Sequence, residues 1–363
     1  MKNDLKIIIA GGGTGGHIFP AISIAGALKK LCPQITMLFI GAEGKMEMEK
    51  VPQAGYNIEG LTIAGFNRAN LFKNISLPFK LLKSFFQVRN IFKKFKPDAV
   101  VGVGGYSSFP VLKFAQLNSI PTFIHESNSF GGKSNIILSK KAVKIFTGSD
   151  GMDKFFPSSK IVITGNPVRQ NIINNNISKE KACNYFGLNP QYKTVLSVGG
   201  SLGAKSINDT LQNNISSFSK NNIQLIWQTG KSFSKNVENI KGIYQTEFIT
   251  EMEYAYAAAD VVISRSGAMS VAELCVAKKA AVLVPYPFAA EDHQTANAMM
   301  LVNKNAAIIV KDSDAKEKLI PTVLNVVMNE KLQNELENNI EKHAIINADE
   351  IIAKEILKSI NEN

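Results

Sequence analysis

Short apolar runs alternate with segments of helical periodicity along almost the whole chain, and this alternation restricts the possible folds more than any other feature. Alternating strands and helices of this kind are typical of parallel sheets covered by helices on both faces. The expected strands are Leu5–Ala10, Ile35–Ile40, Ala99–Val103, Thr122–Ile124, Val143–Phe146, Ile161–Ile163, Thr194–Val198, Gln224–Trp227, Val261–Ser264, Ala281–Val284 and Ala306–Val310.

The pattern stops once and then restarts. Gly165-Asn166-Pro167 has the composition of a turn, and the Asn-rich segment Gln170–Ser178 shows no periodicity. A chain of 363 residues also exceeds what one hydrophobic core usually serves. We therefore predict an α/β protein with two Rossmann-like domains, residues 1–168 and 169–339. A helix over Ile340–Ile360, within a terminal segment 340–363, should follow, and its own sequence does not place it.

Composition excludes several classes of protein. An apolar content of 45% and a charged content of 20% are ordinary for a folded globular chain. No apolar run reaches the roughly 18–20 residues that span a bilayer. Cys32, Cys183 and Cys275 lack metal-ligand spacing, which favours a reduced, cytosolic protein. Glu291, Asp292 and His293 are adjacent and would diverge on a helix, so no metal site is expected there.

A glycine-rich loop, Gly11–His17, follows the first strand and opens the first helix. Such a loop lets backbone N–H groups approach a polar or anionic ligand. It satisfies G-x-G-x-x-G, but the ribose-binding acid of an NAD site should follow the second strand, and Glu43 comes late. His17 is either a general base in the cleft or a residue that only orients the loop.

Three further loops follow later strands. Gly199–Ser206 resembles a Walker A loop, but Ala204 replaces the glycine before the lysine, which favours a pyrophosphate- or sugar-binding turn. Ser264–Glu273 turns from a strand into a helix whose free N–H groups suit a diphosphate. Glu273 could accept two ribose hydroxyls or could simply favour the helix dipole. Polar residues after Pro285-Tyr286-Pro287 lie where α/β proteins usually bind ligands.

Basic and aromatic residues concentrate between residues 60 and 97. This stretch holds eight of the basic residues behind a net charge of +11, together with seven phenylalanines and no acidic residue. Such a segment suits an anionic membrane surface, to which each basic residue could contribute about 1 kcal/mol. The simpler alternative is an amphipathic helix with its phenylalanines in the core. A nucleic-acid surface is disfavoured because no recognition motif is present.

Seven motifs together carry a resemblance to a known family. In order they are Gly12–His17, Gly102–Tyr106, His125–Asn128, Gly165–Arg169, Gly199–Lys205, Ser264–Glu273 and Asp292–Gln294. Over essentially the whole chain the sequence resembles the MurG family of glycosyltransferases. The resemblance implies two Rossmann-like domains facing across a cleft, the GT-B arrangement, and a last helix that returns to the first domain. It also implies inverting transfer of N-acetylglucosamine from UDP-GlcNAc to the 4-hydroxyl of a lipid-linked MurNAc-pentapeptide, lipid I.

The resemblance also implies roles for individual residues. Glu273 would bind the ribose, Ile249 the edge of the uracil, and Ser201 and Arg169 the diphosphate. The expected donor-binding residues are Thr14, Gly15, Gly16, Asn128, Arg169, Ser201, Ile249, Ala268, Met269, Ser270, Val271, Ala272, Glu273 and Gln294. Gly104, Gly105 and Tyr106 would help to hold the acceptor diphosphate, and His17 is the candidate base. No cofactor, metal or nucleic acid is expected. The protein should lie peripherally on the cytoplasmic face of the inner membrane.

Three rival functions are weaker. A UDP-sugar transferase acting on diacylglycerol or another lipid would share these loops and the basic surface. An NAD-dependent oxidoreductase would use the first loop but leave the segment Ala268–Glu273 unexplained. A sugar-nucleotide epimerase fits two Rossmann-like domains but has no use for the basic, phenylalanine-rich segment.

Overall fold

The computed structural model describes residues 4–65, 77–234 and 240–362. The chain forms two compact units, Met1–Val168 with Asn347–Asn363, and Arg169–Ile346. The first change of unit therefore falls between Val168 and Arg169. The second falls after Ile346 rather than after residue 339, which corrects the predicted boundary.

The first unit is built on a seven-stranded parallel sheet in the order β3-β2-β1-β4-β5-β6-β7. Its strands are β1 (Lys6–Ala10), β2 (Thr36–Ala42), β3 (Asn57–Leu61), β4 (Ala99–Gly102), β5 (Thr122–Glu126), β6 (Lys144–Thr147) and β7 (Ile161–Ile163). Its helices are α1 (Gly15–Leu31), α2 (Glu47–Gln53), α3 (Leu77–Phe95), α4 (Ser108–Leu117), α5 (Lys133–Ser139) and α15 (Ala348–Asn361).

Helices cover both faces of this sheet, and the residues of β1 show why the sequence requires it. Ile7 and Ile9 belong to one apolar cluster, whereas Ile8 and Ala10 belong to another. Successive side chains of a strand point to opposite faces, so a continuous apolar strand must be buried on both sides. The first cluster contains residues of α1 and α15, and the second contains residues of α3 and α4.

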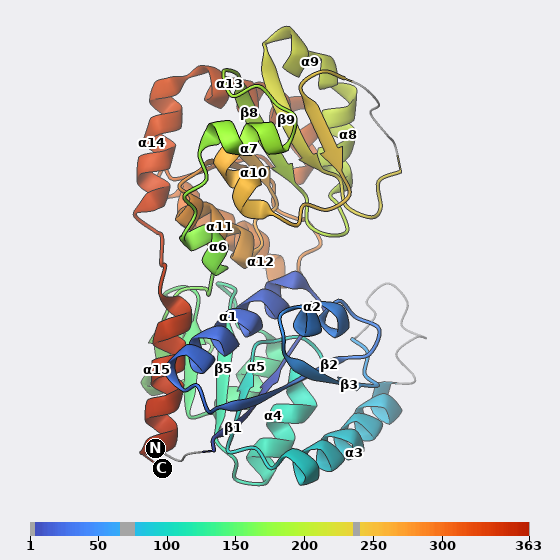
Figure 1. The fold of residues 1–363 in the computed structure, drawn as a ribbon, viewed down its shortest axis with the longest axis vertical. Coiled ribbons are helices and arrows are strands. Elements are labelled where there is room, and N and C mark those ends of the chain that lie inside the picture. Colours follow the sequence, from blue (N-terminus) through green and yellow to red (C-terminus); the bar gives the residue numbers. More distant parts are fainter. Residues whose placement is uncertain (1–3, 66–76, 235–239, 363) are drawn as a thin grey trace. The chain divides into compact units, whose positions relative to one another are not determined.

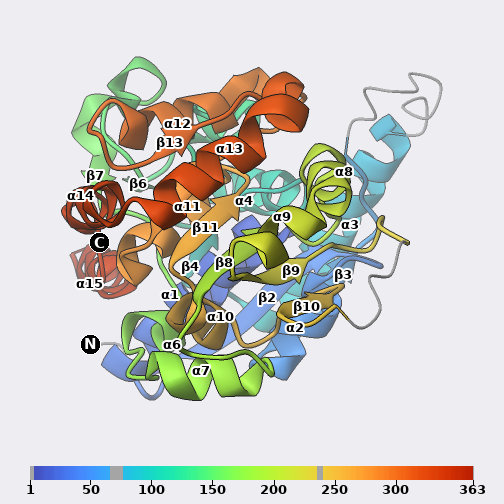
Figure 2. The ribbon, with the colours of Figure 1, turned by 90° about the horizontal axis from the view of Figure 1, so that it is seen from above.

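The second unit contains a six-stranded parallel sheet in the order β10-β9-β8-β11-β12-β13, with β10 beside β9 at one edge (Figure 2). Its strands are β8 (Lys193–Val198), β9 (Ile223–Gln228), β10 (Ile243–Thr246), β11 (Val261–Ser264), β12 (Ala280–Leu283) and β13 (Ile308–Ile309). Its helices are α6 (Gln170–Ile173), α7 (Lys179–Tyr185), α8 (Lys205–Asn213), α9 (Ile215–Lys220), α10 (Met252–Ala258), α11 (Ala268–Ala277), α12 (His293–Val302), α13 (Ala315–Met328) and α14 (Glu330–Glu341). Each unit is thus Rossmann-like, as predicted.

The predicted single terminal helix is wrong in its extent. Helix α14 ends at Glu341 and α15 begins at Ala348, with Ile345 and Ile346 exposed between them. A β-branched pair followed by asparagine has low helix propensity, and the chain changes unit at this point. Helix α15 packs against α1 in the first unit (Figure 1). Lys30 Nζ lies 2.8 Å from Glu350 Oε1 across this contact, and Ile352 and Ile356 enter the core.

Candidate functional site

In the first unit, the glycine-rich loop and the start of α1 bring the candidate base to the carboxyl end of β1. Thr14 is the N-cap residue of α1, and Gly15, Gly16 and His17 form its first turn. His17 Nδ1 lies 3.1 Å from the Gly12 carbonyl oxygen and 3.3 Å from Thr14 Oγ1. A carbonyl oxygen can only accept, so this contact favours the tautomer with the proton on Nδ1. The basic lone pair of the imidazole is then on Nε2.

The loop after the neighbouring strand β4 packs directly on the glycine-rich loop. Gly12 N donates to the Gly104 carbonyl at 3.3 Å, and a Cβ on Gly105 would lie only 2.3 Å from the Gly12 carbonyl oxygen. A Cβ on Gly104 would come within 2.7 Å of the His17 ring. Both glycines also have positive φ. Gly104 and Gly105, predicted as acceptor residues, are therefore required for close packing beside His17.

Asn128 follows β5, and its loop is held by a buried carboxylate that sequence reasoning did not single out. Glu126 Oε1 accepts from Asn128 N at 3.2 Å and from Asn128 Nδ2 at 3.3 Å. Glu126 Oε2 accepts from Gly132 N at 3.0 Å and from Asn135 Nδ2 at 2.8 Å. With Nδ2 of Asn128 directed to Glu126, its Oδ1 is the better-placed atom to accept from a ligand hydroxyl.

A second histidine of the first unit lies deeper in the protein. His125 on β5 is fully buried, and burial, followed by the nearby His17, lowers the pKa of His125 to about 4. The imidazole of His125 is therefore neutral at physiological pH. A residue with so low a pKa and no exposed surface is a poor general base, which leaves His17 as the histidine suited to that role.

In the second unit, Glu273 on α11 forms the centre of a charged cluster. Arg169 Nε and an Arg169 terminal nitrogen lie 3.1 Å and 3.0 Å from Glu273 Oε1, and Tyr256 donates to Glu273 Oε2 at 3.2 Å. Burial and then the Glu273 carboxylate hold the pKa of Tyr256 well above its usual value. Glu273 is only 8% exposed and lies in the second turn, so the simple role of a first-turn glutamate does not describe it.

The start of α11 leaves its backbone donors uncapped by side chains. Gly267 is the N-cap residue and makes no side-chain cap, while Ser266 Oγ donates to the Gln294 carbonyl at 2.8 Å. The first N–H groups of a helix have no acceptor within the helix. The segment Ala268–Glu273, which includes Met269, Ser270, Val271 and Ala272, is therefore helical and starts with N–H groups available to an anion.

Gln228 at the end of β9 connects two other predicted donor residues, although it belongs to no motif that could have identified it. Its Nε2 donates to the Gly200 carbonyl at 3.3 Å, next to Ser201. Its Oε1 accepts from Ile249 N at 3.0 Å. The Ile249 side chain is buried and its N–H is engaged, so a nucleobase contact at this residue would have to use the Ile249 carbonyl.

Gln294 and Arg265 organise the neighbouring loop after β12. Gln294 Oε1 accepts from Tyr286 N at 2.9 Å. The Arg265 guanidinium donates to the Val284 and Pro285 carbonyls at 3.0 Å and 3.1 Å and lies 5.5 Å from the centre of the Tyr286 ring. Ser201 follows β8 and Gln294 follows β12, so both lie at the carboxyl ends of strands of the second sheet, as predicted for loops that follow strands.

The basic segment divides into a buried part and an exposed part. Phe66, Arg68, Phe72 and Lys73 lie outside the described residues. On α3, Phe92 is buried and Phe85 and Phe95 are partly buried, and Phe92 and Phe95 pack in the core. Phe79, Leu82 and Phe86 are instead 76%, 57% and 58% exposed.

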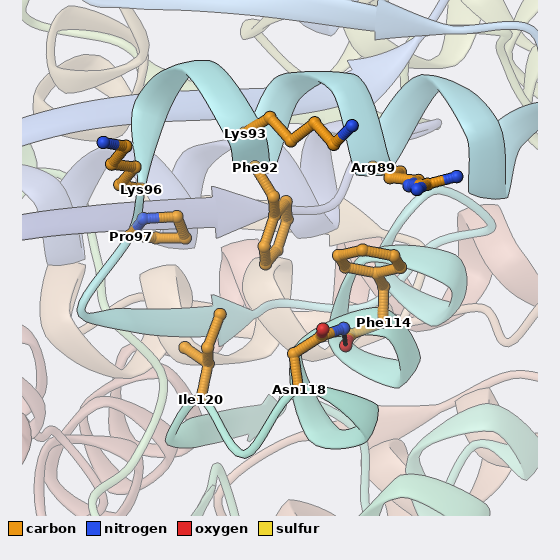
Figure 3. Close-up of a pocket in the computed structure, with 8 residues that line it drawn as sticks. All are labelled: Arg89, Phe92, Lys93, Lys96, Pro97, Phe114, Asn118 and Ile120. Carbon is orange, nitrogen blue, oxygen red and sulfur yellow. Dashed lines mark hydrogen bonds between the residues drawn. The ribbon is translucent and has the colours of Figure 1, made fainter.

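An open pocket of about 380 Å³ lies at the end of α3 (Figure 3). Phe92 and Phe114 pack edge to face within it, with ring centres 5.0 Å apart. The lining contains three cationic residues and no acidic one: Arg89, Phe92, Lys93, Lys96, Pro97, Phe114, Asn118 and Ile120. The pocket therefore combines an apolar floor with a positive rim.

Neither a metal-binding cluster nor a membrane-spanning helix is found among the described residues. No group of three or more His, Cys, Asp or Glu side chains among them could hold a metal ion. Within the same part of the chain, no helix is long and apolar enough to cross a membrane.

Comparison with known proteins identifies relatives over the full chain. Residues 7–147 match the glycosyltransferase family 28 N-terminal domain, and residues 194–354 match the family 28 C-terminal domain. The UDP-N-acetylglucosamine–N-acetylmuramyl-(pentapeptide) pyrophosphoryl-undecaprenol N-acetylglucosamine transferase of Bacteroides thetaiotaomicron is 51% identical over 99% of this chain and 98% of that protein. The crystal structure of Acinetobacter baumannii MurG has a TM-score of 0.74 at 30% identity, covering 98% of this chain and 99% of its own.

A structure from a different enzyme class shares the fold alone. UDP-GlcNAc 2-epimerase from Neisseria meningitidis, bound to UDP-GlcNAc, has a TM-score of 0.71 at 15% identity, covering 98% of this chain and all of its own. Fold by itself thus does not separate transferase from epimerase.

Proposed function

The chain belongs to glycosyltransferase family 28, and on that premise we infer that it transfers N-acetylglucosamine from UDP-GlcNAc to undecaprenyl-pyrophosphoryl-MurNAc-pentapeptide. The product is lipid II, the lipid-linked disaccharide used in peptidoglycan synthesis. The observation that carries this inference is the 51% identity to a transferase named for both substrates. This identity also favours the pyrophosphoryl acceptor over diacylglycerol, and transfer over epimerisation.

We propose that the second unit binds the donor. The start of α11 would hold the diphosphate through its backbone N–H groups, with Ser201 contributing its hydroxyl. Glu273 would accept from the ribose hydroxyls, and the Ile249 carbonyl would meet the uracil edge. Gln294 lies on the neighbouring helix, where its amide could bond a sugar hydroxyl.

The contact between Arg169 and Glu273 changes one proposed role. Arg169 was expected at the diphosphate, but its guanidinium lies on Glu273 Oε1. We therefore propose that Arg169 supports the ribose-binding carboxylate and positions it. The two contacts from the guanidinium fix the orientation of the carboxylate, whose oxygens could then accept from the ribose hydroxyls.

In the first unit, His17 is proposed as the general base. The acceptor 4-hydroxyl would lose its proton to His17 Nε2 as its oxygen attacks the anomeric carbon. The bond from that carbon to the diphosphate breaks, and UDP leaves with the electron pair. A single displacement inverts the configuration at the anomeric carbon. Neither step requires a cofactor, because helix N–H groups stabilise the leaving diphosphate.

Helix α3 is proposed to lie on an anionic membrane surface. Phe79, Leu82, Phe86, Arg89 and Lys93 are spaced three and four residues apart, so they share one face of the helix. That face is exposed and apolar at its start and basic at its end. Helix α3 begins after β3 and ends before β4. The apolar start of α3 therefore lies toward the carboxyl ends of the strands. The glycine-rich loop follows β1 at the same end of the sheet, where a membrane-bound acceptor would be needed.

The identity of the acceptor is the part of this proposal to test first. The protein should be incubated with UDP-GlcNAc and either a lipid I analogue or diacylglycerol, and the products should be identified by mass and by NMR of the new linkage. We expect a β-linked N-acetylglucosamine at O4 of MurNAc and no glycosylated diacylglycerol. Glycosylation of diacylglycerol alone would contradict the proposed acceptor.

A further inference from the structure

A buried carboxylate lies beneath the glycine-rich loop of the first unit and has no role in the function described so far. Glu47, the first residue of α2, is 1% exposed. Its Oε2 accepts from Gly13 N at 2.9 Å, and its Oε1 accepts from Ala42 N at 3.0 Å. Among the described residues, no lysine or arginine forms an ion pair with this carboxylate. Backbone N–H groups are therefore its observed partners.

The loop is shaped around this carboxylate. Gly12 has a φ of +149°, and a Cβ at Gly12 would lie 2.2 Å from Glu47 Oε1. A Cβ at Gly41, on β2, would come within 2.5 Å of Glu47 Cγ. Glycine is thus required on two sides of Glu47.

One peptide group connects Glu47 to His17. The N–H of Gly13 donates to Glu47, and the C=O of the same peptide group, that of Gly12, accepts from His17 Nδ1 at 3.1 Å. Hydrogen bonds in a chain polarise one another. A carboxylate on the N–H side increases the negative charge on the carbonyl oxygen, which strengthens the bond from Nδ1–H.

We propose that Glu47 is a positioning residue for the transfer reaction, which orients His17 and supports its basicity through the Gly12–Gly13 peptide group. The arrangement is equivalent to a carboxylate–histidine pair with one peptide group inserted between the two side chains. It holds the proton on Nδ1, directs Nε2 as the base and stabilises the imidazolium formed when the acceptor hydroxyl is deprotonated.

Other titratable groups near His17 do not supply this effect. His125 on β5 is neutral above pH 4 and, if charged, would oppose protonation of His17. Tyr106, in the loop after β4, also borders the glycine-rich loop, and its ring would be 3.8 Å from a Cβ on Gly13. A neutral phenol does not stabilise an imidazolium as a carboxylate does. Glu47 is thus an anionic group that hydrogen bonds connect to His17 through one peptide group.

The experiment compares Glu47→Gln with Glu43→Gln in the full-length protein. Glutamine keeps the size of Glu47 and removes its charge. Glu43 is an exposed carboxylate that accepts from Thr62 Oγ1 at 3.0 Å, so Glu43→Gln makes the same charge change without touching the loop. The readout is an NMR titration of the four histidines, with His17 assigned by its loss in His17→Gln.

We expect Glu47→Gln to lower the pKa of His17 by roughly half a pH unit or more, because an anion that favours the imidazolium has been removed. The share of the Nδ1–H tautomer should fall as well. Glu43→Gln should change neither. A His17 titration that is identical in wild type and a folded Glu47→Gln protein would overturn the proposal. If Glu47→Gln does not fold, Glu47→Asp can replace it. Aspartate keeps the charge, but its shorter side chain places the carboxylate farther from Gly13, so the pKa of His17 should fall by a smaller amount.

The kinetic measurement separates this proposal from the proposed function, on which its catalytic meaning rests. In Glu47→Gln, kcat should fall about tenfold or more with a small change in the KM for UDP-GlcNAc, and the acidic limb of the pH profile should move to lower pH. A shifted His17 titration with unchanged kcat would remove His17 from the base role and leave its coupling to Glu47 intact. A lower kcat with an unmoved acidic limb would contradict the coupling.

Discussion

Arg169 and Glu273 are 104 positions apart in sequence, yet two guanidinium nitrogens of Arg169 lie within 3.1 Å of Glu273 Oε1. The arginine stands at the start of the second unit, and the carboxylate is in the second turn of α11. Tyr256 completes the cluster from α10. The proposed ribose-binding residue is therefore held from two sides before any nucleotide binds.

This cluster predicts that Arg169→Ala weakens donor binding. Loss of the guanidinium leaves the Glu273 carboxylate held by Tyr256 but less firmly oriented, so we expect the KM for UDP-GlcNAc to rise roughly tenfold or more. Glu273→Gln should raise it at least as much. The Kd for UDP, measured by calorimetry, should follow the same order.

The matched control for Arg169→Ala is Lys318→Gln, which removes a surface ion pair with Asp314 in the same unit. That change should leave UDP affinity unaltered, since exposed pairs contribute about 0–1 kcal/mol to stability. If Arg169→Ala bound UDP as tightly as wild type, Arg169 would not be positioning Glu273.

His17→Ala should retain the fold and the donor affinity but lose turnover. His17 is partly exposed at the start of α1, so its removal leaves no large cavity. Loss of a general base typically lowers the rate by about 10² to 10⁴. The measurement is kcat and KM for both substrates, with UDP affinity as the control. Near-wild-type turnover with an unchanged pH profile would exclude His17 as the base.

The exposed face of α3 predicts membrane binding that depends on both apolar contact and charge. Phe79→Ser combined with Phe86→Ser should remove apolar insertion, and Lys93→Glu should reverse one charge of the pocket in Figure 3. Co-sedimentation with vesicles rich in anionic phospholipid should fall several-fold for each variant, while kcat with a water-soluble acceptor stays unchanged. Lys316→Glu, an exposed lysine on the second unit, is the control. Binding that ignores anionic lipid and all these changes would contradict the proposed surface.

His125 predicts how stability depends on pH. Its pKa is about 4 in the folded protein, below the usual value of 6.5, so the unfolded chain binds the proton more tightly. The stability contributed by neutral His125 is complete above pH 6.5 and is lost as the pH falls towards 4, by about 3 kcal/mol at most. Urea unfolding at pH 7 and pH 5 should show a smaller loss in His125→Asn than in wild type. The partly exposed His343→Gln should behave nearly like wild type.

Much of this architecture can be read from the sequence, and the omissions have physical causes. The central strands β1, β4 and β11 are almost entirely apolar because both faces of the sheet are buried, so their apolar runs can be recognised in the sequence. Strands β3 and β10 escaped prediction because both are sheet edges with polar residues, such as Asn57 and Gln245, among their apolar ones. Edge strands bury less surface and carry a weaker signal.

In the candidate site, too, local features could be predicted from the sequence and contacts between distant segments could not. The glycine loops and the helix at Ala268 are local features, and the sequence placed them after strands. The contacts of Glu47 with Gly13, of Glu126 with Asn135, and of Arg169 with Glu273 connect segments that only the fold brings together. A lone glutamate in a charged stretch such as Lys45–Lys50 carries no sign of burial, so the role proposed for Glu47 could not have been predicted.

The most direct test of the central claim is UDP release from UDP-GlcNAc in detergent, measured with and without a lipid I analogue. We predict slow release in the absence of acceptor and a large, saturable increase when the analogue is added, matched mole for mole by sugar transferred to it. Tight UDP binding without acceptor-dependent release would contradict the proposed acceptor. UDP release that does not depend on the lipid I analogue would contradict the assignment as a transferase.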